Sequence, residues 1–147
     1  ENASIDRMMN ETATRETFRI KGESTITLND YQNGRKFDDA LCYSFYPIDL
    51  HTKDGVVPKH LKRGVVPTIP RGALIPKGSK NLMVAGRCLS SDRLANSAAR
   101  VQASCMGMGQ AAACTAVLAA KSSITPKEVP LGEIHSLLRE HGAIVPA

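Results

Sequence analysis

The segment Asn81-Leu82-Met83-Val84-Ala85-Gly86 decides the fold, together with the run without charged residues that separates Arg100 from Lys121. A short apolar run that contains valine and ends at glycine predicts a buried strand. The small-residue segment after the intervening polar loop predicts a long buried helix. A strand end and a helix start therefore fall close together. In open α/β folds ligands bind at such a place, because free backbone N–H groups converge there.

The predicted helix over residues 98–120 has little side-chain bulk. Its many alanines and glycines allow a strand, a helix or a flat ligand to approach the backbone closely. Gly107 and Gly109 each cost about 1 kcal/mol of helix propensity relative to alanine, so tight burial must stabilise this segment. We therefore expect the small-residue face to pack against the strand that ends at Gly86.

The amino end of this helix is the candidate ligand site. Ser97 or Asn96 would cap the helix, and the N–H groups near Ala99–Val101 would present the positive end of the helix dipole. Arg100 adds a full positive charge at the same place. An anion, or a group that becomes anionic during a reaction, would be stabilised there.

Several blocks, in this order along the chain, resemble a known family. They are Arg15–Gly22, Ile48–His51, Ile69–Lys77, Asn81–Ser90 and Arg100–Ala112. Together they resemble the carboxy-terminal part of the FAD-dependent oxidoreductase family found in many bacterial genomes. The resemblance runs from about Arg15 to Gly142, and its ordered blocks are far more specific than any one block alone.

The resemblance implies FAD as the cofactor, with the strand before Gly86 beside the flavin and the helix amino end facing its pyrimidine edge. A reduced flavin carries negative charge on its N1/O2 side, which Arg100 and the helix dipole would stabilise. The implied cofactor-binding residues are Ala85, Gly86, Arg87, Cys88, Ser97, Ala99, Arg100 and Val101. Arg87 stands where many flavoproteins carry an aspartate, and its contact with phosphate, substrate or solvent stays open.

A complete enzyme of this family would carry a strand followed by Gly-x-Gly-x-x-Gly, which holds the FAD pyrophosphate. The sequence has no such element. Gly107-x-Gly109-x-x-Ala112 matches a looser pattern, but it lies inside the predicted helix, where its context favours packing. We therefore expect a carboxy-terminal fragment that is inactive alone and has the amino-terminal part of the same protein as its partner.

His51 and Arg71 are the candidate catalytic residues. His51 follows Asp49 and could orient a substrate or move a proton, since an unperturbed histidine titrates near about pH 6.5. A guanidinium binds carboxylates in a bidentate fork, so Arg71 could bind an anionic substrate. A solvated histidine and a structural salt bridge are the alternatives. The resemblance implies hydride transfer to FAD from an unidentified small molecule, anionic or polar.

Composition leaves two other function classes open. One is a binding or interaction module on a flavoprotein-like scaffold without cofactor. The other is a nucleic-acid-binding domain, suggested only by the net charge of +5 and unsupported by aromatic interleaving or a recognition motif. The cysteines have no C-x-x-C spacing, so we expect buried thiols and no metal site. Polar side chains within the uncharged run 101–120 favour a helix buried in protein over a membrane span.

The predicted fold class is mixed α/β. It comprises a polar segment 1–14, a β-rich substrate-side portion 15–79, and a carboxy-terminal part of an FAD-binding domain, 80–147. Residues 37–46 fit either a strand or a helix. The other predicted elements are paired strands at Thr17–Lys21 and Ser24–Leu28, a hairpin across Asp54-Gly55 and a last helix at Leu131–Glu140.

Overall fold

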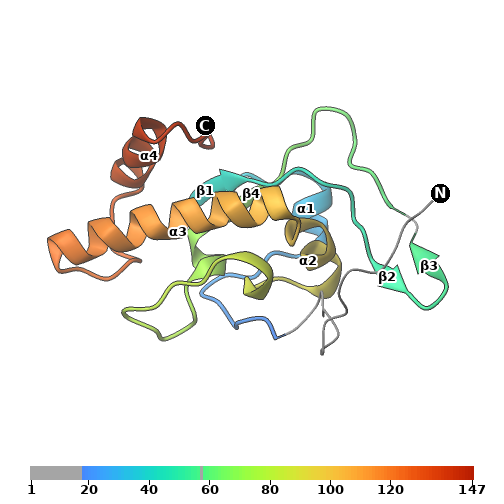
Figure 1. The fold of residues 1–147 in the computed structure, drawn as a ribbon, viewed down its shortest axis with the longest axis horizontal. Coiled ribbons are helices and arrows are strands. Elements are labelled where there is room, and N and C mark those ends of the chain that lie inside the picture. The colour runs from blue at the N-terminus through green and yellow to red at the C-terminus, as the bar shows by residue number, and fades with distance from the viewer. Residues whose placement is uncertain (1–17, 57) are drawn as a thin grey trace, which may run out of the picture.

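The computed structural model of the chain describes residues 18–56 and 58–147, so the predicted polar segment 1–14 lies outside the described residues. Within them the fold is mixed α and β, as predicted (Figure 1). The helices are α1 (Leu28–Gln32), α2 (Arg93–Ala99), α3 (Gln102–Ser122) and α4 (Leu131–Glu140). The strands are β1 (Ala40–Tyr43), β2 (His51–Thr52), β3 (Gly55–Val56) and β4 (Thr68–Pro70), with 3-10 turns η1 (Arg71–Leu74) and η2 (Gly86–Cys88).

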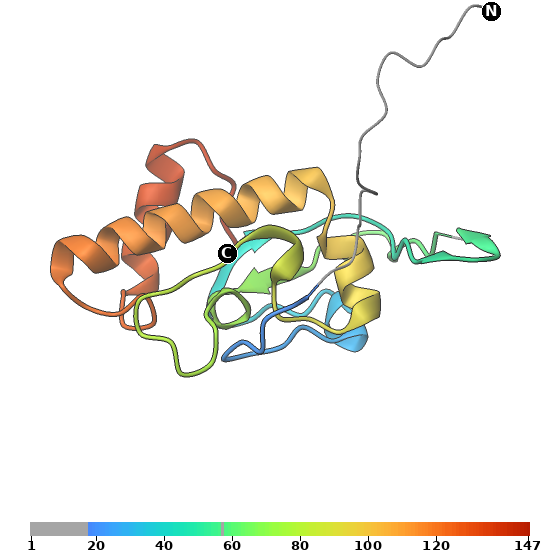
Figure 2. The same cartoon turned by 60° about the horizontal axis from the view of Figure 1, so that its bottom comes forward.

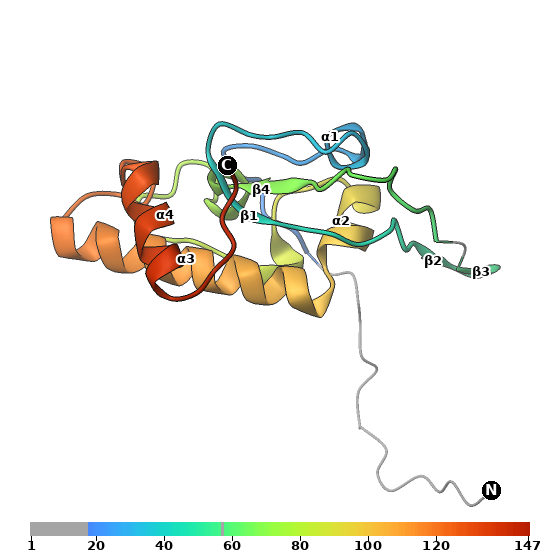
Figure 3. The ribbon, with the colours of Figure 1, turned by 90° about the horizontal axis from the view of Figure 1, so that it is seen from above.

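The antiparallel pair β1–β4 occupies the centre, with Cys42 opposite Ile69 and Tyr43 opposite Thr68. Helix α1 lies on one side of this pair and α3 on the other (Figure 3). The ambiguous segment 37–46 thus forms a strand, β1. Ala40, Leu41 and Cys42 are all buried, because β1 is covered on both faces, and a strand buried on both faces has a continuous apolar run.

One cluster of buried apolar side chains holds the described residues together. It includes Ile26, Leu41 and Ile69 from the expected portion 15–79 and Met108 and Ile134 from the expected portion 80–147. The division between these portions stays a prediction.

Two short helices begin at a shared carboxylate. Thr27 and Asp30 form a capping box at the start of α1. Asp92 is the N-cap of α2, and its Oδ1 accepts a hydrogen bond from the Ala95 backbone N–H at 2.8 Å. Its Oδ2 accepts from the backbone N–H of Leu28, the first residue of α1. One side chain therefore satisfies free N–H groups at the start of both helices.

The prediction of one continuous helix over 98–120 is wrong, because α2 ends at Ala99 and α3 begins at Gln102. Val101, with φ −67° and ψ 154°, is extended and acts as the N-cap of α3 without a side-chain hydrogen bond. The predicted caps, Ser97 and Asn96, lie inside α2.

Neither Ser97 nor Asn96 caps α3, and the side chains of both residues have other hydrogen-bond partners. The Ser97 hydroxyl donates to the Leu94 carbonyl at 2.7 Å, and the Asn96 amide donates to the Arg87 carbonyl at 3.1 Å.

The strand predicted to end at Gly86 is an extended segment outside any sheet. The Val84 N–H donates to the Leu74 carbonyl at 2.8 Å, and Ala85 has φ −140° and ψ 157°. A strand needs a continuous ladder of hydrogen bonds to a neighbouring strand. Residues 82–85 belong to neither sheet of the described residues.

The strands predicted at Thr17–Lys21 and Ser24–Leu28 do not pair with each other in the part of them that the structure describes. The Glu23 N–H donates to the Ile75 carbonyl, and the Ile26 N–H donates to the Ser90 carbonyl. Residues 18–27 instead cross the later chain through isolated bridges, Gly22 to Pro76 and Ile26 to Ser91.

Two local predictions are confirmed. The hairpin β2–β3 turns at Lys53-Asp54, one residue earlier than predicted, and Gly55, with φ 104°, begins β3; the hairpin projects from the body (Figure 2). Helix α4 spans the predicted residues and is followed by Gly142 with φ 75°. Positive φ is the conformation in which glycine ends helices and forms tight turns at low cost.

Helix α3 is long and apolar enough, by length and composition, to cross a membrane, and 33% of its most apolar window is buried. Core helices of globular proteins meet the same criterion. On its buried side α3 packs against β1, η2 and α4.

Candidate functional site

The amino end of α3 is open to solvent. Gln102 and Ala103 are exposed, and their backbone N–H groups meet no acceptor within residues 18–56 and 58–147. The helix behind them is 21 residues long, so its dipole places partial positive charge at this end. Free N–H donors and this charge can bind an anion or an electron-rich ring edge.

The turn η2 lies against the same part of α3. Gly86 has φ 84°, and a Cβ built on it would lie 3.7 Å from the Sγ of Cys105. The Cys105 thiol donates to the Arg100 carbonyl at 3.3 Å, and the Cys88 thiol donates to the Ala85 carbonyl at 3.5 Å. Burial raises the pKa of Cys105, against the opposing effect of the nearby Arg87 guanidinium. The structure thus brings the predicted residues 85–88 beside the start of α3.

Arg100 connects the end of α2 to the base of the hairpin. Its Nη2 donates to the Asp49 carbonyl at 3.0 Å, while the Asp49 N–H donates to the Ser97 hydroxyl at 3.2 Å. The Asp49 Oδ2 lies 3.5 Å from the Nε2 of His51. The predicted catalytic histidine is therefore linked through Asp49 to the predicted cofactor residue Arg100.

Ser97 and Ala99 are fully buried within α2. The Ser97 hydroxyl is bonded to Leu94 and Asp49, so its contacts described here are with protein. Both residues support Arg100 and Val101 from behind, and their assignment to the cofactor site stays a prediction.

Two buried polar atoms near this site, the Nε of Arg100 and the Oδ1 of Asn96, have no hydrogen-bond partner among the described residues. An unsatisfied buried polar atom costs about 1–3 kcal/mol, and a polar ligand that reaches it recovers that cost. The sequence predicted Asn96 only as a helix cap. An amide side chain next to a helix predicted to be buried was the signal that could have indicated a further role. Of the two atoms, one is a donor and the other an acceptor, and both belong to α2 or to the residue that follows it.

Arg71 lies elsewhere in the fold. Its Nη1 donates to the carbonyls of Val129 and of Pro126, in the segment just before α4. Burial lowers the pKa of Arg71, and the negative charge of Asp39 opposes that shift. The hairpin that carries His51 projects at the opposite end of the molecule from α4 (Figure 1). The structure therefore does not bring the two predicted catalytic residues together.

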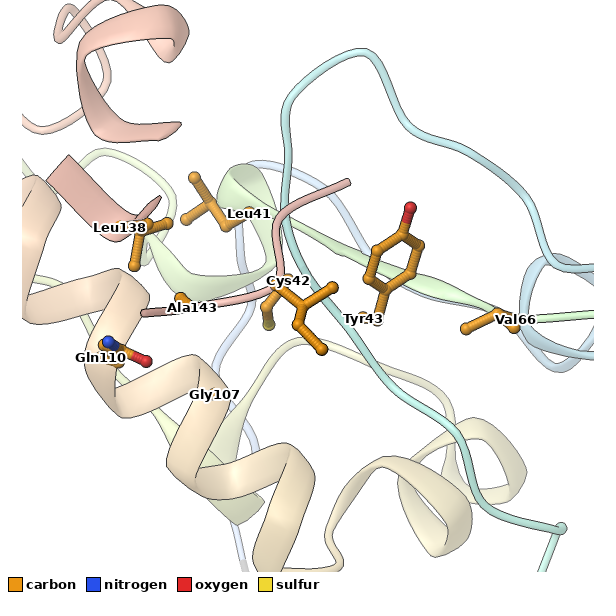
Figure 4. A pocket seen from close by; sticks show the side chains of 9 residues that line it. Leu41, Cys42, Tyr43, Val66, Gly107, Gln110, Leu138 and Ala143 are labelled. Carbon is orange, nitrogen blue, oxygen red and sulfur yellow. The ribbon is translucent and has the colours of Figure 1, made fainter. Parts of the chain in front are cut away.

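A cavity of about 400 Å³ lies between β1, α3, α4 and the C-terminal segment (Figure 4). None of the sequence-predicted site residues lines it. Its walls come from parts of the chain that are distant in sequence, and Gly107 was the one wall residue that the sequence singled out.

All four cysteines are free thiols. Burial raises the pKa of Cys42 to about 12 and also raises that of Cys114. Over the described part of the chain, no group of three or more His, Cys, Asp or Glu side chains is placed to hold a metal ion.

The glycine turn η2, the free amino end of α3 and Arg100 lie together where α2 gives way to α3. The family described as FAD dependent oxidoreductase has a model that matches residues 1–138. The chain therefore belongs to the FAD-dependent oxidoreductase family. No curated protein and no solved structure matches the chain significantly.

Proposed function

We propose that this chain forms the flavin-facing part of an oxidoreductase that transfers a hydride from a polar or anionic small molecule to FAD. The observation that carries the proposal is the free amino end of α3 beside η2 and Arg100, in a member of this family. FAD, when bound, supplies the two-electron acceptor.

In this proposal the segment Ala85–Cys88 presents backbone to the flavin, because the positive φ of Gly86 leaves no Cβ in the way. Arg100 brings positive charge to the N1/O2 edge, and the free N–H groups that follow the N-cap Val101 bring the positive end of the helix dipole; both stabilise the reduced form. Ser97 and Ala99 hold these residues in place through their burial in α2.

His51 is proposed to take up or release a proton at its imidazole while the substrate reacts. Asp49, 3.5 Å away, stabilises the protonated ring and orients it. Arg71 has hydrogen bonds to Val129 and Pro126 that fix the segment before α4, so we assign it a positioning role.

The pyrophosphate of FAD has no cradle in this proposal within the described residues, because Gly107 and Gly109 both lie inside α3. We place that cradle on an amino-terminal part of the same protein, which would be the partner of this chain.

The test is a calorimetric titration of the chain with riboflavin, FMN and FAD. The site would bind the isoalloxazine and ribityl groups common to all three, so the three dissociation constants should agree within about threefold. FAD bound at least about tenfold more tightly than riboflavin would place the pyrophosphate cradle within this chain. If no flavin binds either to this chain or to the longer protein with the amino-terminal part, the scaffold is a binding module without cofactor and the flavin proposal fails.

A matched pair of variants ties the result to the site. Arg100→Ala should weaken riboflavin binding, whereas Arg139→Ala, on the last turn of α4, should leave it unchanged. Equal affinities in the two variants would contradict the placement of the flavin at α3.

A further inference from the structure

The cavity between β1, α3, α4 and the C-terminal segment has no role in the proposed flavin chemistry. Its lining consists of Leu41, Cys42, Tyr43, Val66, Gly107, Gln110, Leu138, Ala143 and Ile144. Figure 4 shows side chains from β1, α3 and α4 arranged around it, with the C-terminal segment at Ala143 forming a further wall.

The cavity lies on a different face of α3 from the candidate flavin site. Cys105 approaches Gly86 of η2, whereas a Cβ on Gly107 would lie 3.7 Å from the Cβ of Cys42 in the cavity wall. Successive helical residues are rotated by about 100°, so these two positions point to nearly opposite sides of the helix. A ligand in the cavity would therefore be separated from the flavin by the helix itself.

The lining carries no charged side chain and no histidine. Burial raises the pKa of Cys42 to about 12, so its thiol is neutral at physiological pH. The two polar side chains bind the C-terminal segment: Gln110 donates to the His141 carbonyl at 3.3 Å, and the Tyr43 hydroxyl accepts from the Ala147 N–H at 3.4 Å. An ion in this cavity would find no counter-charge, and the apolar walls would remove part of its hydration.

The size of the cavity sets the size of its ligand. An apolar cavity of about 150 Å³ is enough to hold benzene. The cavity in this protein has a volume of about 400 Å³ and therefore has room for two or three rings. Gly107 contributes no side chain to the wall, which leaves a flat surface on α3.

The family match ends at residue 138, so the wall formed by Ala143 and Ile144 lies outside it. The other walls lie within the match.

We propose that this cavity is a binding site for a neutral, apolar small molecule of two to three rings, or an aliphatic molecule of similar volume. The proposal stands independently of flavin binding.

The experiment compares two fluorescent probes that share the same aromatic rings. N-phenyl-1-naphthylamine is neutral, and 1-anilinonaphthalene-8-sulfonate carries one negative charge. The neutral probe should bind one per chain with a blue-shifted emission, and the sulfonate should bind at least about tenfold more weakly. The chain contains no tryptophan, so its own emission does not obscure the probe.

Two leucine substitutions on α3 provide a matched pair. Gly107→Leu places a side chain in the cavity and should raise the dissociation constant of the neutral probe at least about tenfold. Gly109→Leu adds the same side chain where a Cβ would meet nothing within 4 Å, and should leave the dissociation constant unchanged.

Val66→Phe tests the cavity from another wall, at a side chain that is 38% exposed, and remains informative if Gly107→Leu lowers the melting temperature. Unchanged affinity in both cavity variants would overturn the proposal, and so would equal binding of the two probes. Sedimentation that detects the probe only on a dimer would also overturn it, because a second copy would then form the site.

Discussion

The guanidinium of Arg100 donates from Nη2 to the backbone carbonyl of Asp49 at 3.0 Å, across 51 residues of sequence. The N–H of the same Asp49 donates to the Ser97 hydroxyl, so both backbone polar groups of Asp49 are held at the end of α2. Because Asp49 leads into β2, the base of the hairpin is fixed to the junction between α2 and α3. The proposed proton-transfer residue and the proposed cofactor residue thus share one support.

The charge of Arg100 should raise the reduction potential of a bound flavin. At saturating flavin, Arg100→Ala should lower the midpoint potential, because the positive charge stabilises the anionic reduced form more than the neutral oxidised form. A charge or dipole in a partly buried position contributes up to about 2 kcal/mol, or roughly 40 mV for a two-electron couple. Potentiometric titration measures the shift, and Arg100→Lys should retain most of the wild-type value. Identical potentials in wild type and Arg100→Ala would remove Arg100 from the flavin edge.

Gly109→Leu should stabilise the protein. The sequence predicted a packed contact at this glycine and hence destabilisation by overpacking, but a Cβ there would meet nothing within 4 Å. Leucine is the better helix former, so the free energy of unfolding should rise by up to about 1 kcal/mol. Thermal denaturation followed by circular dichroism tests this prediction, and a lowered melting temperature would show that this face of α3 is covered.

Gly22→Ala should strongly destabilise the protein. A Cβ at this position would lie 2.7 Å from both the carbonyl oxygen of Gly72 and the Cβ of Ser90, where the early segment crosses the later chain. Forced overpacking of this kind costs about 1–3 kcal/mol. Gly132→Ala in α4, where a Cβ would meet nothing within 4 Å, is the control and should stabilise the helix. Urea denaturation of both variants measures the difference, and equal free energies of unfolding would contradict the close crossing.

Asp30 should make the stability of α1 depend on pH. Partial burial acts to raise its pKa, but hydrogen bonds from Thr27 and Arg35 outweigh burial and hold the pKa below its ordinary value. A carboxyl with a lowered folded-state pKa contributes stability above its unfolded pKa of about 3.9, and that contribution is lost as pH falls through the folded value.

Asp30→Asn should therefore be less stable than the wild type at pH 7, by about 1 kcal/mol for the weakened cap. The difference should shrink as pH falls below about 4. Urea denaturation at several pH values provides the measurement, and a difference that is constant with pH would assign the effect to something other than the carboxylate charge.

Elements with local signals could be predicted from the sequence. Asp54-Gly55 places the hairpin turn to within one residue, and Pro130 and Gly142 enclose α4. In each case the residues that determine the element are neighbours in sequence, so propensity and turn chemistry are enough.

Elements that depend on distant partners could not be predicted. The segment 18–27 bonds to residues some fifty positions or more further along the chain, such as Ile75 and Ser90, rather than to a neighbouring strand. The break between α2 and α3 coincides with the tertiary hydrogen bonds of Ser97 and Arg100 to Asp49, which no local propensity indicates. The sequence predicted a helix amino end near Ala99–Val101, but α3 begins at Gln102, because the break between the two helices was missed.

The shared carboxylate of Asp92 couples two helices that are separated by 64 residues. If α2 opens, Leu28 loses its acceptor, and if α1 opens, the carboxylate loses one of its two donors. We therefore expect a loss of the Asp92 carboxylate, as in Asp92→Ala, to lower the hydrogen-exchange protection of amides in both helices. During synthesis, the Leu28 N–H has this acceptor only after Asp92 has been added, 64 residues later.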